Sequence, residues 1–202
     1  MMLVAVGLGP GESDLLTLRA IDLLKRADKV FVPGKIAAQI VSPYAQPEIL
    51  DFPMTEDEEE LQEAMRRNAD VIAPHAKEGL VVLGILGDPN FFSTYNHLYS
   101  ALKERYPEVQ CRAEPGISCI TAFASRLNLA VDQGLEVSDG TEPTCLLLLK
   151  VRRPREAAAK LRQQGYKEFF LAERMYMPGE KIYRGEELPE RSDYMSVLFA
   201  RK

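Results

Sequence analysis

The sequence predicts an α/β protein with a mostly parallel sheet in its N-terminal part and a smaller, mixed sheet in its C-terminal part. Residues 80–86 form an apolar, β-branched run typical of a fully buried parallel strand, and Gly87-Asp88-Pro89 ends it abruptly. The chain also opens in the order strand, glycine turn and helix. Beyond residue 144 the strand-like segments lie closer together, with fewer helices between them.

Composition limits the classes of protein to consider. With 202 residues, 46% of them apolar, the chain is long enough for a core in one domain or in two small ones. It has no run of about 18 apolar residues and no basic segment after Met1, so we expect no membrane span, no signal peptide and a cytoplasmic location. The formal charge of -5 argues against a large nucleic-acid interface. Cys111, Cys119 and Cys145 form no CxxC pair, which fits reduced thiols and offers no metal template.

The first part of the chain contains a strand, a helix and a second strand. Ser13 or Asp14 can cap the helix, whose apolar residues recur on one face through residue 27. The strand at 30–32 ends at Pro33-Gly34.

The glycine turn at 7–11 does not fit a phosphate-binding loop. The dinucleotide motif G-x-G-x-x-G would need a small residue at Glu12, and the Lys-Ser/Thr of a Walker loop is absent. Pro10 also removes a backbone donor. The turn therefore favours a bulky, planar partner over a phosphate.

The remaining elements follow from similar signals. Thr55 and Glu58 have capping-box spacing ahead of a helix that Pro74 disturbs. The loop-rich stretch 128–143 resembles a seam between two halves. We expect strands at 3–6, 30–32, 80–86, 109–113, 145–149 and 169–172, β-like segments at 181–183 and 194–199, and helices at 14–27, 55–78, 93–105, 120–127 and 155–164.

The turn after residue 86 is the first candidate binding loop. Gly87 tolerates unusual dihedral angles, Pro89 fixes its own φ, and Ser93 or Thr94 can cap the following helix. In open α/β sheets, ligands bind beyond the carboxyl ends of the strands. A ligand loop and a plain strand-to-helix turn both remain open on this segment alone.

Three motifs in order carry a resemblance to a known family. They are Gly7-Leu8-Gly9-Pro10-Gly11 with Leu15-Leu16-Thr17, then Gly87-Asp88-Pro89, then Pro115-Gly116-Ile117-Ser118. Each is weak alone, but the ordered set resembles the tetrapyrrole methylase family, which comprises S-adenosyl-L-methionine-dependent methyltransferases. The resemblance covers essentially the whole chain. It implies a two-domain fold with an N-terminal domain at 1–114, whose sheet has helices on both faces, a C-terminal domain at 115–202, and a cofactor cleft between them.

Further segments are similar to one branch of that family. They are Pro53-Met54-Thr55, Phe91-Phe92-Ser93-Thr94-Tyr95, Ala172-Glu173-Arg174, Glu180-Lys181-Ile182 and Tyr194-Met195-Ser196. This branch methylates carbon 20 of precorrin-2 or of cobalt-precorrin-2 in cobalamin synthesis. The match is poorer from 132 to 143, where the chain is shortened. The resemblance also implies a homodimer. We expect neither nucleic acid nor a membrane as a partner, because of the negative charge and the lack of an apolar span.

The resemblance assigns site residues position by position. Contacts with S-adenosyl-L-methionine would come from Ile85, Leu86, Gly87, Asp88, Phe91, Phe92, Ser118, Cys119, Met175, Tyr176 and Met195. The tetrapyrrole would face Gly9, Pro10 and Gly11, and its carboxylates would need basic partners, for which Lys35, Arg126 and Arg174 are placed near the cleft.

Methyl transfer from a sulfonium needs in-line positioning and exclusion of water more than a strong base, which fits a site poor in His, Cys and Lys clusters. Asp88 and Tyr95 are the candidate catalytic residues, with Glu114 as a further polar helper. Turn-forming hydrogen bonds explain Asp88 almost as well, and Tyr95 shares an apolar helical face that could equally be core. His97 has no partner at ligand spacing, so no metal is expected.

We therefore expect a methyltransferase acting at carbon 20 of precorrin-2 or cobalt-precorrin-2. The alternatives are methylation at another tetrapyrrole position, methylation of protein or RNA as in distant family members, and a non-catalytic tetrapyrrole- or nucleoside-binding module.

Overall fold

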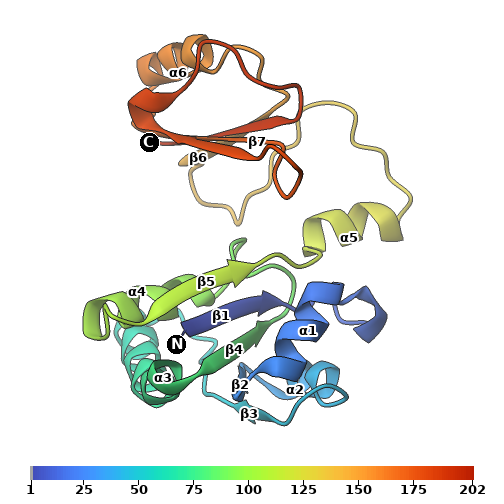
Figure 1. The fold of residues 1–202 in the computed structure, drawn as a ribbon, viewed down its shortest axis with the longest axis vertical. Coiled ribbons are helices and arrows are strands. Elements are labelled where there is room, and N and C mark those ends of the chain that lie inside the picture. The colour runs from blue at the N-terminus through green and yellow to red at the C-terminus, as the bar shows by residue number, and fades with distance from the viewer. Residues whose placement is uncertain (1) are drawn as a thin grey trace. The chain divides into compact units, whose positions relative to one another are not determined.

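A computed structural model describes residues 2–202 of the chain and confirms the α/β class (Figure 1). Contacts divide the chain into two compact units, Met1–Val137 and Ser138–Lys202. The division lies inside the loop-rich stretch 128–143. The contacts thus group residues 115–137 with the first unit, whereas we expected the second domain to begin at 115. No helix within residues 2–202 has both the length and the apolar character needed to cross a membrane.

The first unit contains a five-stranded sheet in which every pairing is parallel. Its strand order is β3-β2-β4-β1-β5, so β4, the predicted buried strand, is central. Gly7 pairs with Ile85 and Val6 pairs with Glu114, so β1, β4 and β5 end at the same edge of the sheet. The strands are β1 (Met2–Gly7), β2 (Lys29–Val32), β3 (Pro47–Ile49), β4 (Leu80–Ile85) and β5 (Gln110–Glu114).

Helices cover both faces of this sheet, as predicted (Figure 1). Leu3 and Ala5 of β1 pack in one cluster with residues of α3 and α4, whereas Val4 and Val6 pack in another with residues of α1 and α2. Because successive side chains of a strand point to opposite faces, β1 contributes to both layers. The helices of this unit are α1 (Leu18–Arg26), α2 (Lys35–Val41), α3 (Glu58–Glu78), α4 (Tyr95–Arg105) and α5 (Cys119–Arg126), with a 3-10 turn at Ser13–Leu15.

The first helix begins later than the sequence indicated. Ser13 and Asp14 lie in the short 3-10 turn, and Thr17 caps α1 by accepting a hydrogen bond from the Ala20 N–H at 3.0 Å. The glycine turn is therefore followed by this 3-10 turn and by two extended residues, Leu16 and Thr17, before the helix starts.

The second unit is a four-stranded sheet with the order β6-β9-β7-β8. Its strands are β6 (Cys145–Leu149), β7 (Glu168–Glu173), β8 (Lys181–Arg184) and β9 (Ser196–Arg201), and a second 3-10 turn spans Gly185–Glu187. Every pairing is antiparallel, so the expectation of a mixed sheet was wrong. Helix α6 (Pro154–Gln163) joins β6 to β7, which run in the same direction, but β9 lies between them.

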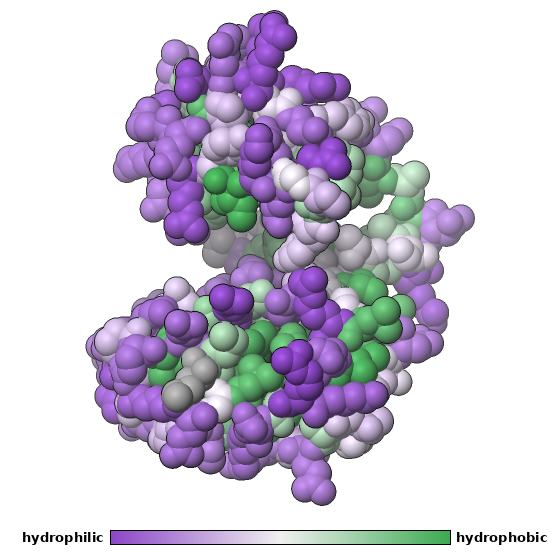
Figure 2. Space-filling model, viewed as in Figure 1, coloured by the Kyte–Doolittle hydropathy of each residue, from purple (hydrophilic) through white to green (hydrophobic). Residues whose placement is uncertain are grey.

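Helix α6 covers one face of the second sheet. Ala158 and Leu161 of the helix pack with Phe169, Leu171 and Leu198 of the sheet. The outward surface over this helix is largely hydrophilic (Figure 2). The second unit therefore has its own small core, separate from the two clusters of the first unit.

Candidate active site

Three glycines meet where β1, β4 and β5 end. Gly7 is the last residue of β1, Gly87 follows β4 and Gly116 follows β5. A Cβ atom placed on Gly7 would lie 2.7 Å from the Gly87 carbonyl oxygen, and one on Gly116 would lie 2.6 Å from the Gly7 Cα. Real Cβ atoms do not approach other atoms this closely. Only residues without a side chain therefore let the three backbones touch.

The glycine turn and the loop after β4 are bonded to each other. The Gly87 N–H donates to the Gly9 carbonyl at 2.7 Å, and the Gly9 N–H donates to the Gly87 carbonyl at 3.4 Å. Gly9 has a φ of 73° and a Cβ there would lie 3.0 Å from the Leu15 carbonyl oxygen, so glycine is required for two reasons. These amides are occupied within the protein, which agrees with the failure of the turn as a phosphate-binding motif.

Asp88 ties the β4 loop to the β5 loop. Its side chain is nearly buried, with the residue 8% exposed. One carboxylate oxygen accepts the Asn90 N–H at 2.8 Å, and the other accepts the Gly116 N–H at 3.1 Å. Asp88 thus makes the turn-forming bond expected of the structural alternative and a second bond to a loop 28 residues away. Each oxygen keeps acceptor capacity for a ligand.

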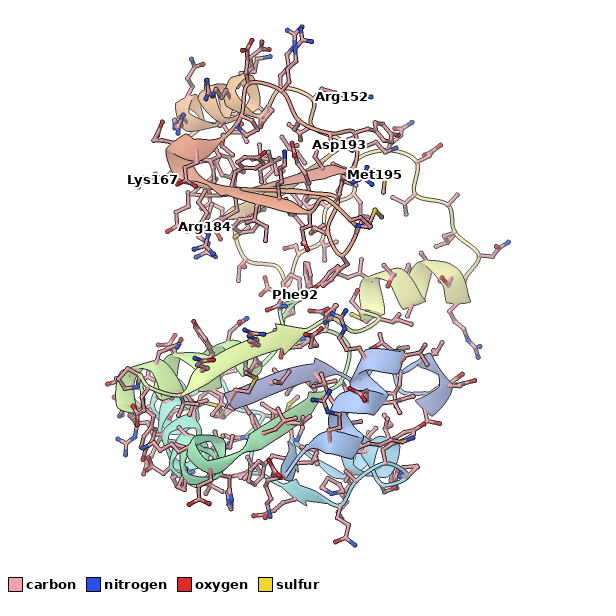
Figure 3. All side chains as sticks on the ribbon, in the orientation of Figure 1. Phe92, Arg152, Lys167, Arg184, Asp193 and Met195 are labelled. Atoms are coloured by element: carbon pink, nitrogen blue, oxygen red, sulfur yellow. The ribbon has the colours of Figure 1, made fainter. Side chains whose placement is uncertain are left out.

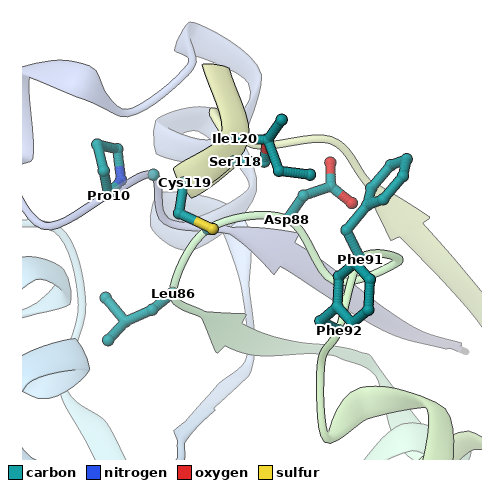
Figure 4. A pocket seen from close by; sticks show the side chains of 10 residues that line it. Pro10, Leu86, Asp88, Phe91, Phe92, Ser118, Cys119 and Ile120 are labelled. Carbon is teal, nitrogen blue, oxygen red and sulfur yellow. The ribbon is translucent and has the colours of Figure 1, made fainter. Parts of the chain in front are cut away.

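A pocket of about 230 Å³ opens at this junction (Figure 4). Asp88 and Cys119 lie between Pro10 on one side and the two phenylalanine rings on the other. The walls are mainly apolar, as is usual for sites that bind organic ligands. The lining residues are Gly9, Pro10, Leu86, Gly87, Asp88, Phe91, Phe92, Ser118, Cys119 and Ile120.

Most residues that line the pocket are ones to which the resemblance assigned ligand contacts. The β4 loop and the start of α5 supply the expected cofactor side, and Gly9 and Pro10 come from the expected substrate side. Ile85 is buried at the end of β4, one position before the lining begins. Ile120 was not among the predicted site residues, although it directly follows Cys119 at the start of α5.

Two phenylalanines at the pocket are exposed. Phe91 is 47% exposed and Phe92 is 64% exposed, although burying such a ring would be favourable. Phe92 also has a φ of 49°, in the left-handed region that bulky residues rarely adopt. Strain of this kind costs about 1–3 kcal/mol and concentrates at functional sites. Both features indicate a surface shaped to receive a ligand.

Unpaired polar groups also line the pocket. Within residues 2–202, the backbone N–H and C=O of Leu86 and the hydroxyl of Ser118 form no hydrogen bond with another protein group. Since strong backbone donors and acceptors are normally satisfied, these groups are available to a bound molecule. The site can hold an organic ligand largely through backbone groups.

Tyr95 does not reach the pocket. Its side chain is buried in the core between the sheet and α3 and α4, and its hydroxyl donates to the Arg112 carbonyl at 3.4 Å. Burial raises the pKa of this hydroxyl far above its ordinary value. Tyr95 is therefore a core residue, which was one of the two alternatives for it, and it does not lie beside the pocket.

The other predicted polar residues of the first unit are dispersed. Glu114 forms an ion pair with Arg19 at 3.0 Å, and Lys35 is exposed at the start of α2. Gly11 and Arg126 are exposed and do not line the pocket. Over residues 2–202, no group of His, Cys, Asp and Glu side chains could hold a metal ion.

The predicted residues of the second unit gather at one end of its sheet. The Arg174 N–H donates to the Met195 carbonyl at 2.7 Å, which joins the loop after β7 to the segment before β9. Met175, Tyr176 and Met195 are exposed there, although each has a large apolar side chain. The Arg174 guanidinium donates to the Pro178 carbonyl at 2.9 Å and lies 3.7 Å from Asp193. Within this unit, the structure thus brings these four residues together.

Comparisons with known proteins agree with this architecture. A sequence profile of the Tetrapyrrole (Corrin/Porphyrin) Methylases matches residues 2–188. The chain is 31% identical to the cobalt-precorrin-2 C(20)-methyltransferase of Salmonella typhimurium, over 99% of this chain and 96% of that protein. It is 29% identical to a probable cobalt-precorrin-2 C(20)-methyltransferase of Methanocaldococcus jannaschii, over 98% of this chain and 94% of that protein.

Solved structures share the fold at lower identity. The crystal structure of the methyltransferase CobJ superposes with a TM-score of 0.52 and 21% identity, covering 100% of this chain and 94% of that one. Uroporphyrin-III-C-methyltransferase from Thermus thermophilus gives a TM-score of 0.51 and 23% identity, covering 100% of this chain and 92% of that one. With the profile match spanning nearly all of the sequence, the chain belongs to the tetrapyrrole (corrin/porphyrin) methylase family and is a methyltransferase.

Proposed function

We propose that this protein transfers a methyl group from S-adenosyl-L-methionine to carbon 20 of precorrin-2 or cobalt-precorrin-2 in cobalamin biosynthesis. The observation that best supports methyl transfer is the apolar pocket at the three-glycine junction, where the backbone groups of Leu86 are unpaired. The choice of substrate is supported by two relatives that match over nearly their whole length and carry that activity in their names.

The residues present fit an S-adenosyl-L-methionine molecule. The backbone groups of Leu86 and the Ser118 hydroxyl can bond its polar groups, while Phe91, Phe92 and Ile120 can contact its apolar surface. The cofactor supplies a methyl group that is already activated on a sulfonium. The protein then has to orient donor and acceptor and exclude water, and orientation alone can contribute roughly 7–11 kcal/mol. No base with a strongly shifted pKa is needed for this.

Several finer parts of the proposal rest on the family resemblance. We include Met175, Tyr176 and Met195 as cofactor contacts, Arg174, Lys35 and Arg126 as partners of substrate carboxylates, and a cleft between the two domains as the site of reaction. We also propose a homodimer, which the exposed apolar residues Leu147, Leu149, Phe170 and Ile182 on the second sheet support. A cytoplasmic location completes the proposal.

The decisive experiment supplies the protein with methyl-labelled S-adenosyl-L-methionine and with precorrin-2, in one arm metal-free and in the other loaded with cobalt. We expect one label per tetrapyrrole at carbon 20 in at least one arm, located by carbon NMR. Label at a different carbon would redirect the assignment to another position. No label in either arm would exclude the substrate, and no cofactor binding by calorimetry would exclude the proposed donor.

A further inference from the structure

Two segments, residues 150–152 and residues 192–196, meet at one end of the second sheet and are joined by hydrogen bonds to their backbones. The Lys150 N–H donates to the Ser196 carbonyl at 2.8 Å, and the Ser192 N–H donates to the Arg152 carbonyl at 3.1 Å. The hydroxyls of Ser192 and Ser196 both donate to the Val151 carbonyl. Four hydrogen bonds therefore hold residues 150–152 against residues 192–196, which gives the side chains on these segments a rigid support.

Two cations and a tyrosine project from this support. The Lys150 Nζ lies 5.3 Å from the centre of the Tyr194 ring, and the Arg152 guanidinium carbon lies 5.1 Å from it. All three residues are exposed. Hydrogen bonding to the Tyr194 hydroxyl raises the pKa of the Lys150 ammonium, so the group stays charged.

The two cations lack a carboxylate partner of the kind that the neighbouring Arg153 has. Among the described residues, neither Lys150 nor Arg152 forms an ion pair, whereas Arg153 pairs with Glu156 at 3.1 Å. The nearby Asp193 carboxylate is already engaged, because it accepts the Met195 N–H at 2.7 Å and lies 3.7 Å from Arg174. An anion from outside the protein can therefore bind both cations without displacing an internal partner.

Backbone strain gathers at the same end of the sheet. Lys150, Arg174 and Tyr176 have φ values of 56°, 52° and 60°. Non-glycine residues rarely adopt this left-handed conformation, and it concentrates at sites of function. For Lys150 it directs the chain out of β6 and into the bonded segment, which indicates a site whose geometry is maintained against local preference.

We infer that Lys150, Arg152 and Tyr194 form a carboxylate-binding subsite on the second unit and that it receives a carboxylate of the tetrapyrrole. The inference rests on the proposed function, which supplies a polycarboxylate substrate. An ammonium, a guanidinium and a hydroxyl together offer the donors that a carboxylate accepts. In residues 138–202 basic side chains outnumber acidic ones, although the whole chain carries a charge of -5. This excess of positive charge favours a ligand with several negative charges. The methionine carboxylate of the cofactor has the same chemistry, so it is the other carboxylate that could occupy this subsite.

Binding of uroporphyrin III, a fluorescent polycarboxylate tetrapyrrole, tests the subsite without requiring methylation. Lys150→Gln and Arg152→Gln should each raise its Kd about three- to tenfold, the range expected for exposed charge-assisted contacts, and high salt should reduce the difference. Tyr194→Phe should have a smaller effect in the same direction. Lys167→Gln is the matched control, because it removes the same charge at the other end of this sheet (Figure 3).

Calorimetry with S-adenosyl-L-methionine separates the two sources. We expect the cofactor Kd to be unchanged in all four variants, and weaker cofactor binding with unchanged porphyrin binding would overturn the assignment to the tetrapyrrole. The subsite is also refuted if Lys150→Gln and Arg152→Gln behave like Lys167→Gln, or if the wild-type protein binds no uroporphyrin. Porphyrin binding that depends on Lys150 and Arg152, without methyl transfer to precorrin-2, would instead refute the proposed function and leave the subsite standing.

Discussion

At the scale of single residues, the junction of Gly7, Gly87 and Gly116 is the most restrictive feature of the site. Gly116→Ala would place a Cβ 2.6 Å from the Gly7 Cα, and backbone cannot move aside as a side chain can. We expect the free energy of unfolding to fall by about 3 kcal/mol, the upper end of typical overpacking. Gly134→Ala, with no atom within 4 Å of its Cβ, is the control and should denature like wild type. Equal urea midpoints for the two variants would show that the junction is not closely packed.

Asp88 provides a second prediction at this scale. Asp88→Ala leaves the Gly116 N–H without its acceptor, so we expect a loss of about 1–3 kcal/mol in the free energy of unfolding and weaker cofactor binding by a still folded protein. Asp88→Asn keeps one acceptor oxygen and should fall between Ala and wild type in both measurements. Urea denaturation and calorimetry check the two expectations. If affinity is unchanged while stability falls, Asp88 acts only as a structural tether.

The sequence was informative about such residues only where their contacts are local. The hydrogen bond from the Asn90 N–H to Asp88 could be anticipated, because the two residues are neighbours in a turn. The bond from the Gly116 N–H joins two different strand ends and exists only once the strands are paired. Tyr95 was ambiguous for the same reason, since the carbonyl that accepts the hydrogen bond of its hydroxyl belongs to Arg112 on β5.

At the scale of elements, the loop between β4 and α4 combines exposed rings with a strained backbone. Phe92→Asn should relieve strain, because asparagine tolerates a φ of 49° far better than phenylalanine. Little burial is lost, since the ring is mostly exposed, so the free energy of unfolding should stay within about 1 kcal/mol of wild type or rise. The Kd for S-adenosyl-L-methionine should increase several-fold. Denaturation and calorimetry on one preparation test both, and tighter binding by the variant would contradict a ligand role for Phe92.

The elements of the first unit were easier to predict than those of the second. Helices cover both faces of β4, so nearly every residue of this strand has to be apolar. The unbroken apolar run at 80–86 therefore indicated a parallel strand. In the second sheet the direction of pairing depends on β9, the last strand of the chain, which lies between β6 and β7. The composition of a strand does not determine which other strand it pairs with. The sequence therefore predicted a mixed sheet where the structure has an antiparallel one.

For the whole molecule, the two units have separate cores joined by an exposed connection. Residues 128–143 contain no helix or strand, and their side chains are exposed, including Leu129, Val131, Leu135 and Val137. Exposed segments with few backbone hydrogen bonds are the preferred sites of proteolysis. Thermolysin, which cleaves before large apolar residues, should therefore cut within this connection first and release two resistant fragments. Mass spectrometry of the fragments locates the cut, and early cleavage inside β4 or β9 would contradict two separate cores.

The same cleavage tests whether both units bind the ligands at a shared cleft. If the cofactor and a tetrapyrrole bridge the units, they should restrain the connection, and thermolysin should cut more slowly with both ligands than with either alone. Adding the ligands to a mixture containing an unrelated protein substrate controls for direct inhibition of the protease. If each unit binds its ligand independently, the cleavage rate will not change when the second ligand is added. A rate that falls only in the presence of both ligands would support a site that is completed when the two units come together, because each unit supplies part of the binding surface.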